Sequence, residues 1–206
     1  MHELKKAFRI SFIFVFFLWM IKTFEVILDF NLLEYGILPR NIFGLPGILF
    51  SPFIHGGFVH LFSNSIPLLV LGTGMIYLYP KSSIYVLPIV YILGGLGVWL
   101  FARQSSHIGA SGLVYGLAGF IFTSGLVRRD ARAMALSLIV VFLYGGMVWG
   151  IMPLEEGISF ESHLSSAVVG IVCALLFRKK DLSELPASVD IFDEDELTDD
   201  DDEYWK

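Results

Sequence analysis

"GASGLVYGLAGFIFTSGLV", residues 109–127, is apolar enough and long enough to cross a bilayer as one helix. A helix needs about 20 mostly apolar residues to span the hydrocarbon core. Its first turn nevertheless carries a polar side chain, Ser111, and Gly112 and Gly116 form a G-x-x-x-G pair. Because small residues let a second helix approach closely, the stretch predicts a tightly packed membrane helix with a hydroxyl at one end.

The composition of the whole chain indicates a polytopic membrane protein. Of its 206 residues 55% are hydrophobic and 17% are charged, with a mean hydropathy of +0.71. Soluble domains average about 45–50% apolar and about 25% charged residues. The apolar residues fall in runs of membrane-spanning length. We expect an all-α membrane protein with six transmembrane helices, near residues 9–29, 57–78, 84–101, 109–127, 133–152 and 162–177.

A long segment between the first two helices is apolar but cannot be helical throughout. Residues 30–56 are interrupted by glycine and proline at Gly36, Pro39, Gly44, Pro46, Gly47 and Pro52. Proline removes a helix hydrogen bond and clashes with the preceding turn. Irregular backbone at membrane depth is tolerated only where protein covers it. We therefore expect a large interfacial loop between helices 1 and 2, packed on the protein.

The acidic residues of the chain are concentrated at its C-terminal end. Residues 181–206 hold 12 of the 20 acidic residues, whereas residues 1–180 hold 13 basic and 8 acidic residues. Clustered like charge with little to bury is typical of disorder. We expect a membrane domain over residues 1–180 and a disordered acidic tail over residues 181–206, most simply a solvated tail.

The distribution of Lys and Arg predicts the orientation of the helices. One side of the membrane collects Lys5, Lys6, Arg9, Lys81, Arg128, Arg129, Arg132, Arg178, Lys179 and Lys180. The other side collects Arg40 and Arg103. Basic residues accumulate on the cytoplasmic side. The sequence thus predicts a multi-pass protein of the cell membrane with both termini in the cytoplasm.

Polar side chains occur at the outer ends of three of the expected helices. His60 and Asn64 lie in the helix near 57–78, Ser111 begins the fourth helix, and His163 lies in the first turn of the sixth. Polar groups at this depth are costly unless they face the bundle interior or a water cavity. Since alternate helices begin on the same side, we expect these four side chains to converge.

Each polar group has a chemical interpretation and a structural one. His60 and Asn64 share a helix face and can donate to one developing oxyanion, or they can serve as interhelical hydrogen bonds. A neutral His163 can take a proton from Ser111, or it can be a simple interfacial residue. Glu161 is expected to face away from His163, which favours a Ser–His dyad over a triad.

Three motifs carry a resemblance to a known family. They are "HGGFVHLFSN" at residues 55–64, "GASGLVYG" at residues 109–116, and His163 followed by small residues. Over about residues 10–178 the chain resembles the rhomboid intramembrane serine proteases, most closely the small six-span prokaryotic ones. One departure is Ser166, where the family usually has glycine, and this predicts a slightly wider contact with the fourth helix.

The resemblance implies roles for individual residues. Ser111 would be the nucleophile and His163 the general base. His60, Asn64 and the Ser111 amide would form the oxyanion hole. The supporting residues would be His55, Gly109, Gly112 and Tyr115, with Tyr115 stacking on the histidine.

The predicted function is that of an intramembrane serine endopeptidase. Its partners would be the lipid bilayer and transmembrane segments of other proteins, and we expect no cofactor, no metal and no nucleic acid partner. One alternative is a non-catalytic rhomboid-like protein that binds membrane clients. Another is a small transporter, which would need charged residues deep in several helices, whereas only Lys22, Glu25 and Asp29 of the first helix approach this.

Overall fold

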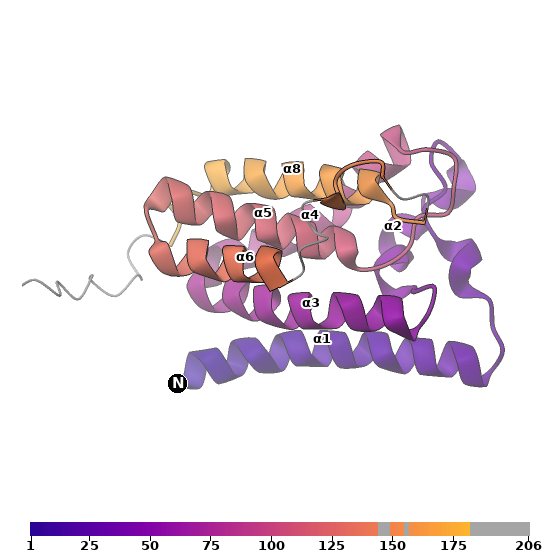
Figure 1. Cartoon of the computed structure of the whole chain (residues 1–206), viewed down its shortest axis with the longest axis horizontal. Coiled ribbons are helices and arrows are strands. Elements are labelled where there is room, and N and C mark those ends of the chain that lie inside the picture. Colours follow the sequence, from indigo (N-terminus) through magenta and orange to yellow (C-terminus); the bar gives the residue numbers. More distant parts are fainter. Residues whose placement is uncertain (144–148, 155–156, 182–206) are drawn as a thin grey trace, which may run out of the picture.

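The computed structural model describes residues 1–143, 149–154 and 157–181, and the secondary structure of these residues is helical apart from one isolated β-bridge (Figure 1). The predicted all-α fold is therefore confirmed. The long helices are α1 (His2–Ile27), α3 (Phe58–Leu78), α4 (Pro80–Phe101), α5 (Ser111–Arg128), α6 (Ala131–Leu143) and α8 (Phe160–Leu176).

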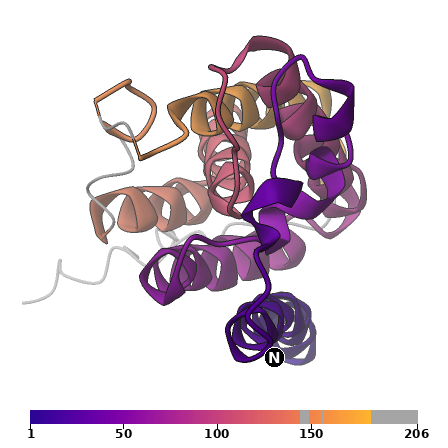
Figure 2. The same cartoon turned by 90° about the vertical axis from the view of Figure 1, so that its right-hand side faces the viewer.

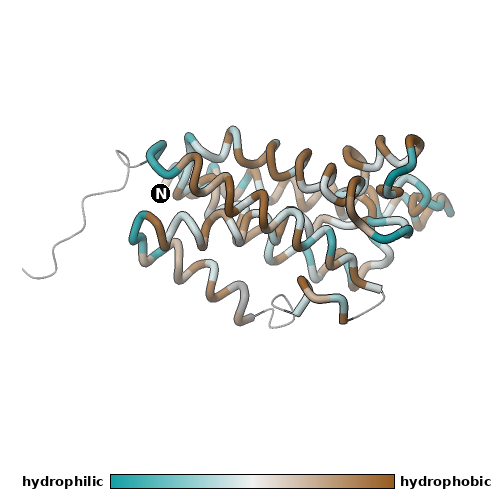
Figure 3. The backbone as a smooth tube through the Cα atoms, turned by 90° about the horizontal axis from the view of Figure 1, so that it is seen from above, coloured by the Kyte–Doolittle hydropathy of each residue, from teal (hydrophilic) through white to brown (hydrophobic). Residues whose placement is uncertain are grey.

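Among the described residues, α1, α3, α4 and α5 are long and apolar enough to cross a membrane, which indicates a multi-pass membrane protein. The helix α8 is apolar but shorter. The expected fifth helix, near 133–152, runs into residues 144–148, which lie outside the described residues. In Figure 3 most of the hydrophilic segments lie toward the two ends of the bundle.

The helix α5 is the centre of the bundle. It packs against α3, α4, α6 and α8, while α1 packs on α3 at the edge (Figures 1 and 2). Its side chains Phe120 and Ile121 are fully buried in the main hydrophobic core. The residue that begins α5, Ser111, is therefore held on the central helix of the described bundle.

Glycines bring the backbones of α5 and α8 into direct contact. A Cβ atom added to Gly170 would clash with the carbonyl oxygen of Gly116, and one added to Gly119 would lie 2.8 Å from the carbonyl oxygen of Ala167. Small residues are what permit such an approach. The predicted glycine-lined contact between these helices is confirmed.

Ser166 does not hold α8 away from α5. A Cβ atom on Gly112 would lie 3.0 Å from the Ser166 hydroxyl, and one on Gly94 of α4 would clash with it. The hydroxyl thus occupies space that two glycines leave free. The wider contact expected from Ser166 is not observed, because these glycines accommodate its side chain.

The segment between α1 and α3 contains only short helical turns and crosses one end of the bundle (Figure 2). These turns are η1 (Leu32–Tyr35), η2 (Ile42–Gly44), α2 (Gly47–Phe50) and η3 (Ser51–Phe53). The indole of Trp99 donates to the Asn41 carbonyl (2.8 Å), and Ile37 exchanges two backbone hydrogen bonds with His107 (2.9 and 3.0 Å). These bonds attach the segment to the end of α4 and to the loop before α5.

Asp181, which the sequence places in the tail, belongs to the folded bundle. It is only 1% exposed and accepts hydrogen bonds from the Lys81 amide (2.9 Å) and the Ser82 hydroxyl. Arg128 lies 3.8 Å from its carboxylate. The folded part therefore extends through residue 181, because this carboxylate accepts hydrogen bonds from the first turn of α4. The rest of the expected tail, residues 182–206, lies outside the described residues.

Candidate active site

Ser111 and His163 meet at one end of the bundle. The Ser111 hydroxyl oxygen lies 2.8 Å from Nε2 of His163, and Nδ1 of the same ring lies 2.8 Å from the Gly150 carbonyl oxygen. A carbonyl oxygen can only accept, so Nδ1 carries the hydrogen and the lone pair of Nε2 faces Ser111. An imidazole in this tautomer can accept the serine proton.

Tyr115 and Gly150 hold the imidazole from two sides. The Tyr115 ring stacks on the His163 ring with centroids 4.0 Å apart and an interplanar angle of 7°. A Cβ atom on Gly150 would lie 3.1 Å from His163 Nδ1 and would clash with the Tyr115 hydroxyl. Only a glycine therefore lets this backbone come close enough for its carbonyl to reach the ring.

The two polar residues of α3 lie beside the residue that leads into Ser111. Gly109 has a φ of 101°, which suits glycine. A Cβ atom there would lie 2.8 Å from His60 Nε2 and 3.6 Å from Asn64 Nδ2. Asn64 is 6% exposed, and its Nδ2 has no hydrogen-bond partner among the described residues. A buried amide donor without a partner is costly and is suited to receive an anionic or carbonyl oxygen.

His55 supports the backbone immediately before Ser111. It is fully buried and packs edge-on against His60, with ring centroids 5.1 Å apart. Burial, with a smaller contribution from His60, lowers the pKa of His55 to about 4. The ring is therefore neutral near pH 7, and its Nε2 accepts the amide hydrogen of Ala110 (3.4 Å). Gly109 is also anchored, because its amide donates to the Ser51 carbonyl (2.9 Å).

Glu161 is directed away from the imidazole, as predicted. Its carboxylate accepts the Arg103 amide hydrogen (3.1 Å) and lies 3.7 Å from the Arg103 guanidinium. The partner of His163 Nδ1 is thus a backbone carbonyl and not a carboxylate. The described ranges contain no group of three His, Cys, Asp or Glu side chains arranged to hold a metal ion.

A small polar cavity adjoins the start of α5. It is about 20 Å³ in volume, and the residues that line it include Ser51, Tyr91, Gly109, Gly112, Ser162 and Ser166. A cavity of this size with polar walls can hold a water molecule.

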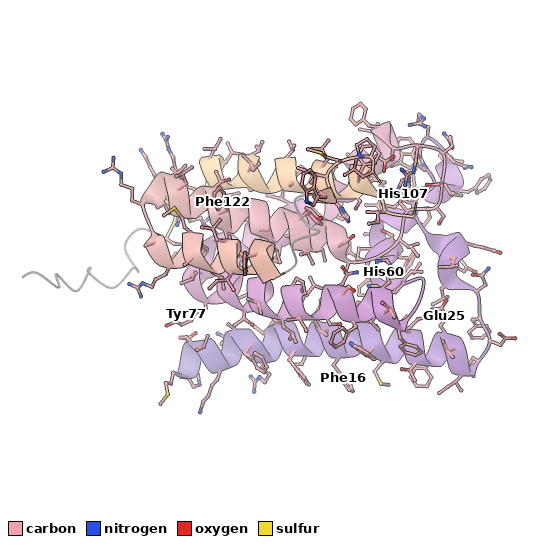
Figure 4. The ribbon with its side chains drawn as sticks, in the orientation of Figure 1. Phe16, Glu25, His60, Tyr77, His107 and Phe122 are labelled. Carbon is pink, nitrogen blue, oxygen red and sulfur yellow. The ribbon has the colours of Figure 1, made fainter. Side chains whose placement is uncertain are left out.

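The four polar residues that were expected to converge all lie at this end of the bundle. They are His60, Asn64, Ser111 and His163. Figure 4 shows His60 near the start of α3 and His107 nearer α8, at the same end. Two contributors could not be found from the sequence. The Gly150 carbonyl belongs to a loop glycine without a side-chain signal, and His107 was not distinguished from other loop residues.

Apolar helices of membrane-spanning length hold a serine hydroxyl within hydrogen-bond distance of an imidazole. The fold and the site therefore define a multi-pass membrane protein with a serine–histidine site. A family model described as the Rhomboid domain matches residues 44–180. The chain belongs to the rhomboid family.

Several relatives are similar over most of the chain. An uncharacterized protein of Mycobacterium tuberculosis is 38% identical over 172 residues, covering 79% of this chain and 72% of the relative. An uncharacterized protein of Mycobacterium leprae is 34% identical over 172 residues, covering 79% of this chain and 68% of the relative. RHOMBOID-like protein 4 of Arabidopsis thaliana is 24% identical over 132 residues, covering 61% of this chain and 32% of that protein.

Proposed function

We propose that this chain is an intramembrane serine endopeptidase that uses Ser111 and His163. The observation that carries the proposal is the 2.8 Å contact between the Ser111 hydroxyl and Nε2 of His163, with Nδ1 held by the Gly150 carbonyl. A nucleophile, a base within hydrogen-bond reach and a group that orients the base are the elements of acyl transfer.

Each step of peptide hydrolysis has a residue to perform it. Ser111 Oγ attacks the scissile carbonyl carbon while its proton passes to Nε2 of His163, and the Gly150 carbonyl stabilises the imidazolium. His60, Asn64 and the Ser111 amide donate to the tetrahedral oxyanion. His163 then protonates the leaving amine, which releases the first product. Water, deprotonated by the same imidazole, hydrolyses the acyl-enzyme and regenerates Ser111.

The surroundings of the site support one substrate class. The helices that carry these residues are apolar, so the substrate would be a transmembrane segment of another protein that enters from the bilayer. Its scissile bond must be in extended or unwound backbone, since an intact helix shields its carbonyls. We expect small or helix-weakening residues near the cleavage position.

The proposed topology has six membrane helices, with α6 and α8 as parts of the fifth and sixth. The starts of α3, α5 and α8 then lie toward the outer side of the cell membrane. Both termini lie in the cytoplasm, as the excess of Lys and Arg predicts. Residues 1–181 form the membrane domain, and residues 182–206 form an acidic cytoplasmic tail.

A fluorophosphonate probe tests this proposal against a non-catalytic client-binding protein. Because His163 must accept the serine proton, we expect labelling at Ser111 in the detergent-purified full chain. His163→Gln should lower the labelling rate at least about 100-fold. The site of labelling is read by mass spectrometry. A folded protein that is not labelled, or is labelled equally well without His163, would favour the client-binding alternative.

Gly150→Ala should slow labelling and cleavage about 10- to 100-fold, because the new methyl group pushes the carbonyl away from His163. The added methyl group clashes with the Tyr115 hydroxyl, so the double variant of Gly150→Ala and Tyr115→Phe should recover part of the rate. Gly157→Ala is the matched control, since a Cβ atom on Gly157 meets nothing within 4 Å. A wild-type rate for Gly150→Ala would show that the carbonyl is not needed.

A further inference from the structure

A second hydroxyl–imidazole pair lies next to Ser111 and His163. His107 is 3% exposed, and its Nδ1 lies 2.6 Å from the hydroxyl oxygen of Ser159. Its Nε2 lies 3.0 Å from the Arg103 carbonyl oxygen. Ser159 is the N-cap residue of α8, the helix that carries His163. His107 lies in the loop that leads into α5, the helix that begins at Ser111.

The direction of these hydrogen bonds can be assigned. The Arg103 carbonyl can only accept, so a neutral His107 carries its hydrogen on Nε2, and the lone pair of Nδ1 accepts the Ser159 O–H. The Ser159 oxygen in turn accepts the Ser162 amide hydrogen (3.3 Å), which caps α8. One continuous chain of bonds therefore joins the loop before α5 to the first turn of α8.

The two pairs connect the same two segments at matching positions. His107 precedes Ser111 by four residues, and Ser159 precedes His163 by four residues. The Ser159 carbonyl also accepts the His163 amide hydrogen (3.3 Å). A displacement of Ser159 thus moves the residue that carries the imidazole. Because the 2.6 Å bond spans the gap between the segments, it limits how far their ends can separate.

The His107 side of this connection is anchored by backbone hydrogen bonds. The His107 backbone amide and carbonyl both bond Ile37, at 3.0 and 2.9 Å. This pairing is the only β-bridge in the described part of the chain, and it fixes the loop to the segment that crosses the end of the bundle. His107 is therefore held in place by its backbone while its ring accepts the Ser159 hydroxyl.

We propose that His107 is a positioning residue that sets the separation of Ser111 and His163 through its hydrogen bond to Ser159. The inference rests on the proposed function and extends it to a residue outside the reacting groups. Arg103 provides a parallel link, since its guanidinium donates to the Ile158 carbonyl (2.6 Å) and lies 3.7 Å from Glu161. The fold can therefore survive the loss of His107, while the spacing of the two reacting groups loosens.

Two conservative variants separate the roles of the two ring nitrogens of His107. Its Nδ1 faces the Ser159 hydroxyl, and its Nε2 faces the Arg103 carbonyl and, at 3.4 Å, the Ser105 hydroxyl. In His107→Asn, the side-chain oxygen is bonded to Cγ, as Nδ1 is, so the bond from Ser159 is kept and the bond to Arg103 is lost. In His107→Gln, the amide nitrogen reaches the position of Nε2, so the Arg103 bond is kept and the Ser159 bond is lost. His107→Leu removes the hydrogen bonds of both nitrogens. On the other side, Ser159→Thr keeps the hydroxyl, and Ser159→Gly removes it at a position where glycine is still accepted as an N-cap.

The rate of fluorophosphonate labelling at Ser111 is measured for each variant of the full chain. We expect His107→Gln, His107→Leu and Ser159→Gly to label about 10- to 100-fold more slowly, because a small misplacement of reacting groups is costly. His107→Asn and Ser159→Thr should stay within about threefold of wild type. The double variant of His107→Leu and Ser159→Gly should be no slower than the slower of the two single variants, because both substitutions remove the bond between His107 and Ser159. With a cleavable substrate, kcat should fall and KM should not change.

Two results would overturn the proposal. One is a wild-type labelling rate in His107→Gln. The other is an equal loss of labelling rate in His107→Asn and His107→Gln, which would mean that His107 acts by holding the loop before α5 and not through Ser159. Crystal structures of the two variants give an answer that does not depend on activity. The Ser111–His163 contact should exceed about 3.5 Å in His107→Gln and remain a hydrogen bond in His107→Asn. If wild-type protein is unlabelled, the proposed function fails, and the two structures still decide the positioning role.

Discussion

Ser111→Ala is expected to abolish cleavage of membrane substrates and to leave the fold intact. The hydroxyl is the atom that would attack the substrate, and serine proteases lose on the order of 10⁴-fold or more without it. The side chain is half-buried at the start of α5, and removing its hydroxyl leaves only the Nε2 lone pair of His163 without its donor. Comparing membrane proteomes of cells with wild-type and variant protein measures the loss and identifies substrates.

The matched control is another serine of the same bundle. Ser63 of α3 is exposed, and its hydroxyl donates to the Val59 carbonyl one turn earlier (2.9 Å). Ser63→Ala should cleave at the wild-type rate. If the protein with Ser111→Ala still produces the same cleavage products, Ser111 takes no part in the chemistry and another nucleophile must be sought.

Gly170→Ala is expected to impair stability and activity together. The added methyl group would clash with the Gly116 carbonyl and lie 3.1 Å from the Phe120 nitrogen, and both are backbone atoms that cannot rotate away. The helix α8 must therefore move off α5. Overpacking of this kind costs about 1–3 kcal/mol, and displacement of His163 should slow labelling about 100-fold. Thermal unfolding in detergent and labelling of Ser111 measure the two effects.

Gly97→Ala provides the contrast, because Gly97 belongs to α4 and approaches α8 from a helix other than α5. A Cβ atom on Gly97 meets the hydroxyl end of Ser165, which can rotate, and the next atom is the Ser165 Cβ at 3.1 Å. We expect a smaller loss of stability and a rate close to wild type. Equal effects of the two substitutions would mean that α8 tolerates movement, and that backbone contact with α5 does not set the geometry of the site.

Both predictions depend on a site divided among several helices. Ser111, His163 and the pair His60 and Asn64 come from α5, α8 and α3, which meet only through tertiary packing. The distances between these side chains therefore change with every shift of one helix relative to another. A substitution far along α8 can then change the rate without contacting the substrate.

The sequence by itself predicted the membrane helices and the polar residues that the structure brings together at one end of the bundle. Runs of apolar residues predict membrane helices because lipid satisfies no backbone hydrogen bond. The glycines and prolines between residues 30 and 56 exclude a long helix there. Polar side chains in otherwise apolar helices stand out because lipid does not tolerate them, and this is how Ser111, His163, His60 and Asn64 were recognised.

Only the tertiary structure decided how these residues are held. The Gly150 carbonyl on Nδ1, the bond between His107 and Ser159, and the burial of Asp181 all join positions far apart in the chain. The hydrophobic effect is not directional, so an apolar helix surface does not specify which helix packs against it. Hydrogen bonds are directional and short, so their partners are known only once the loops and the helix backbones have been placed against one another.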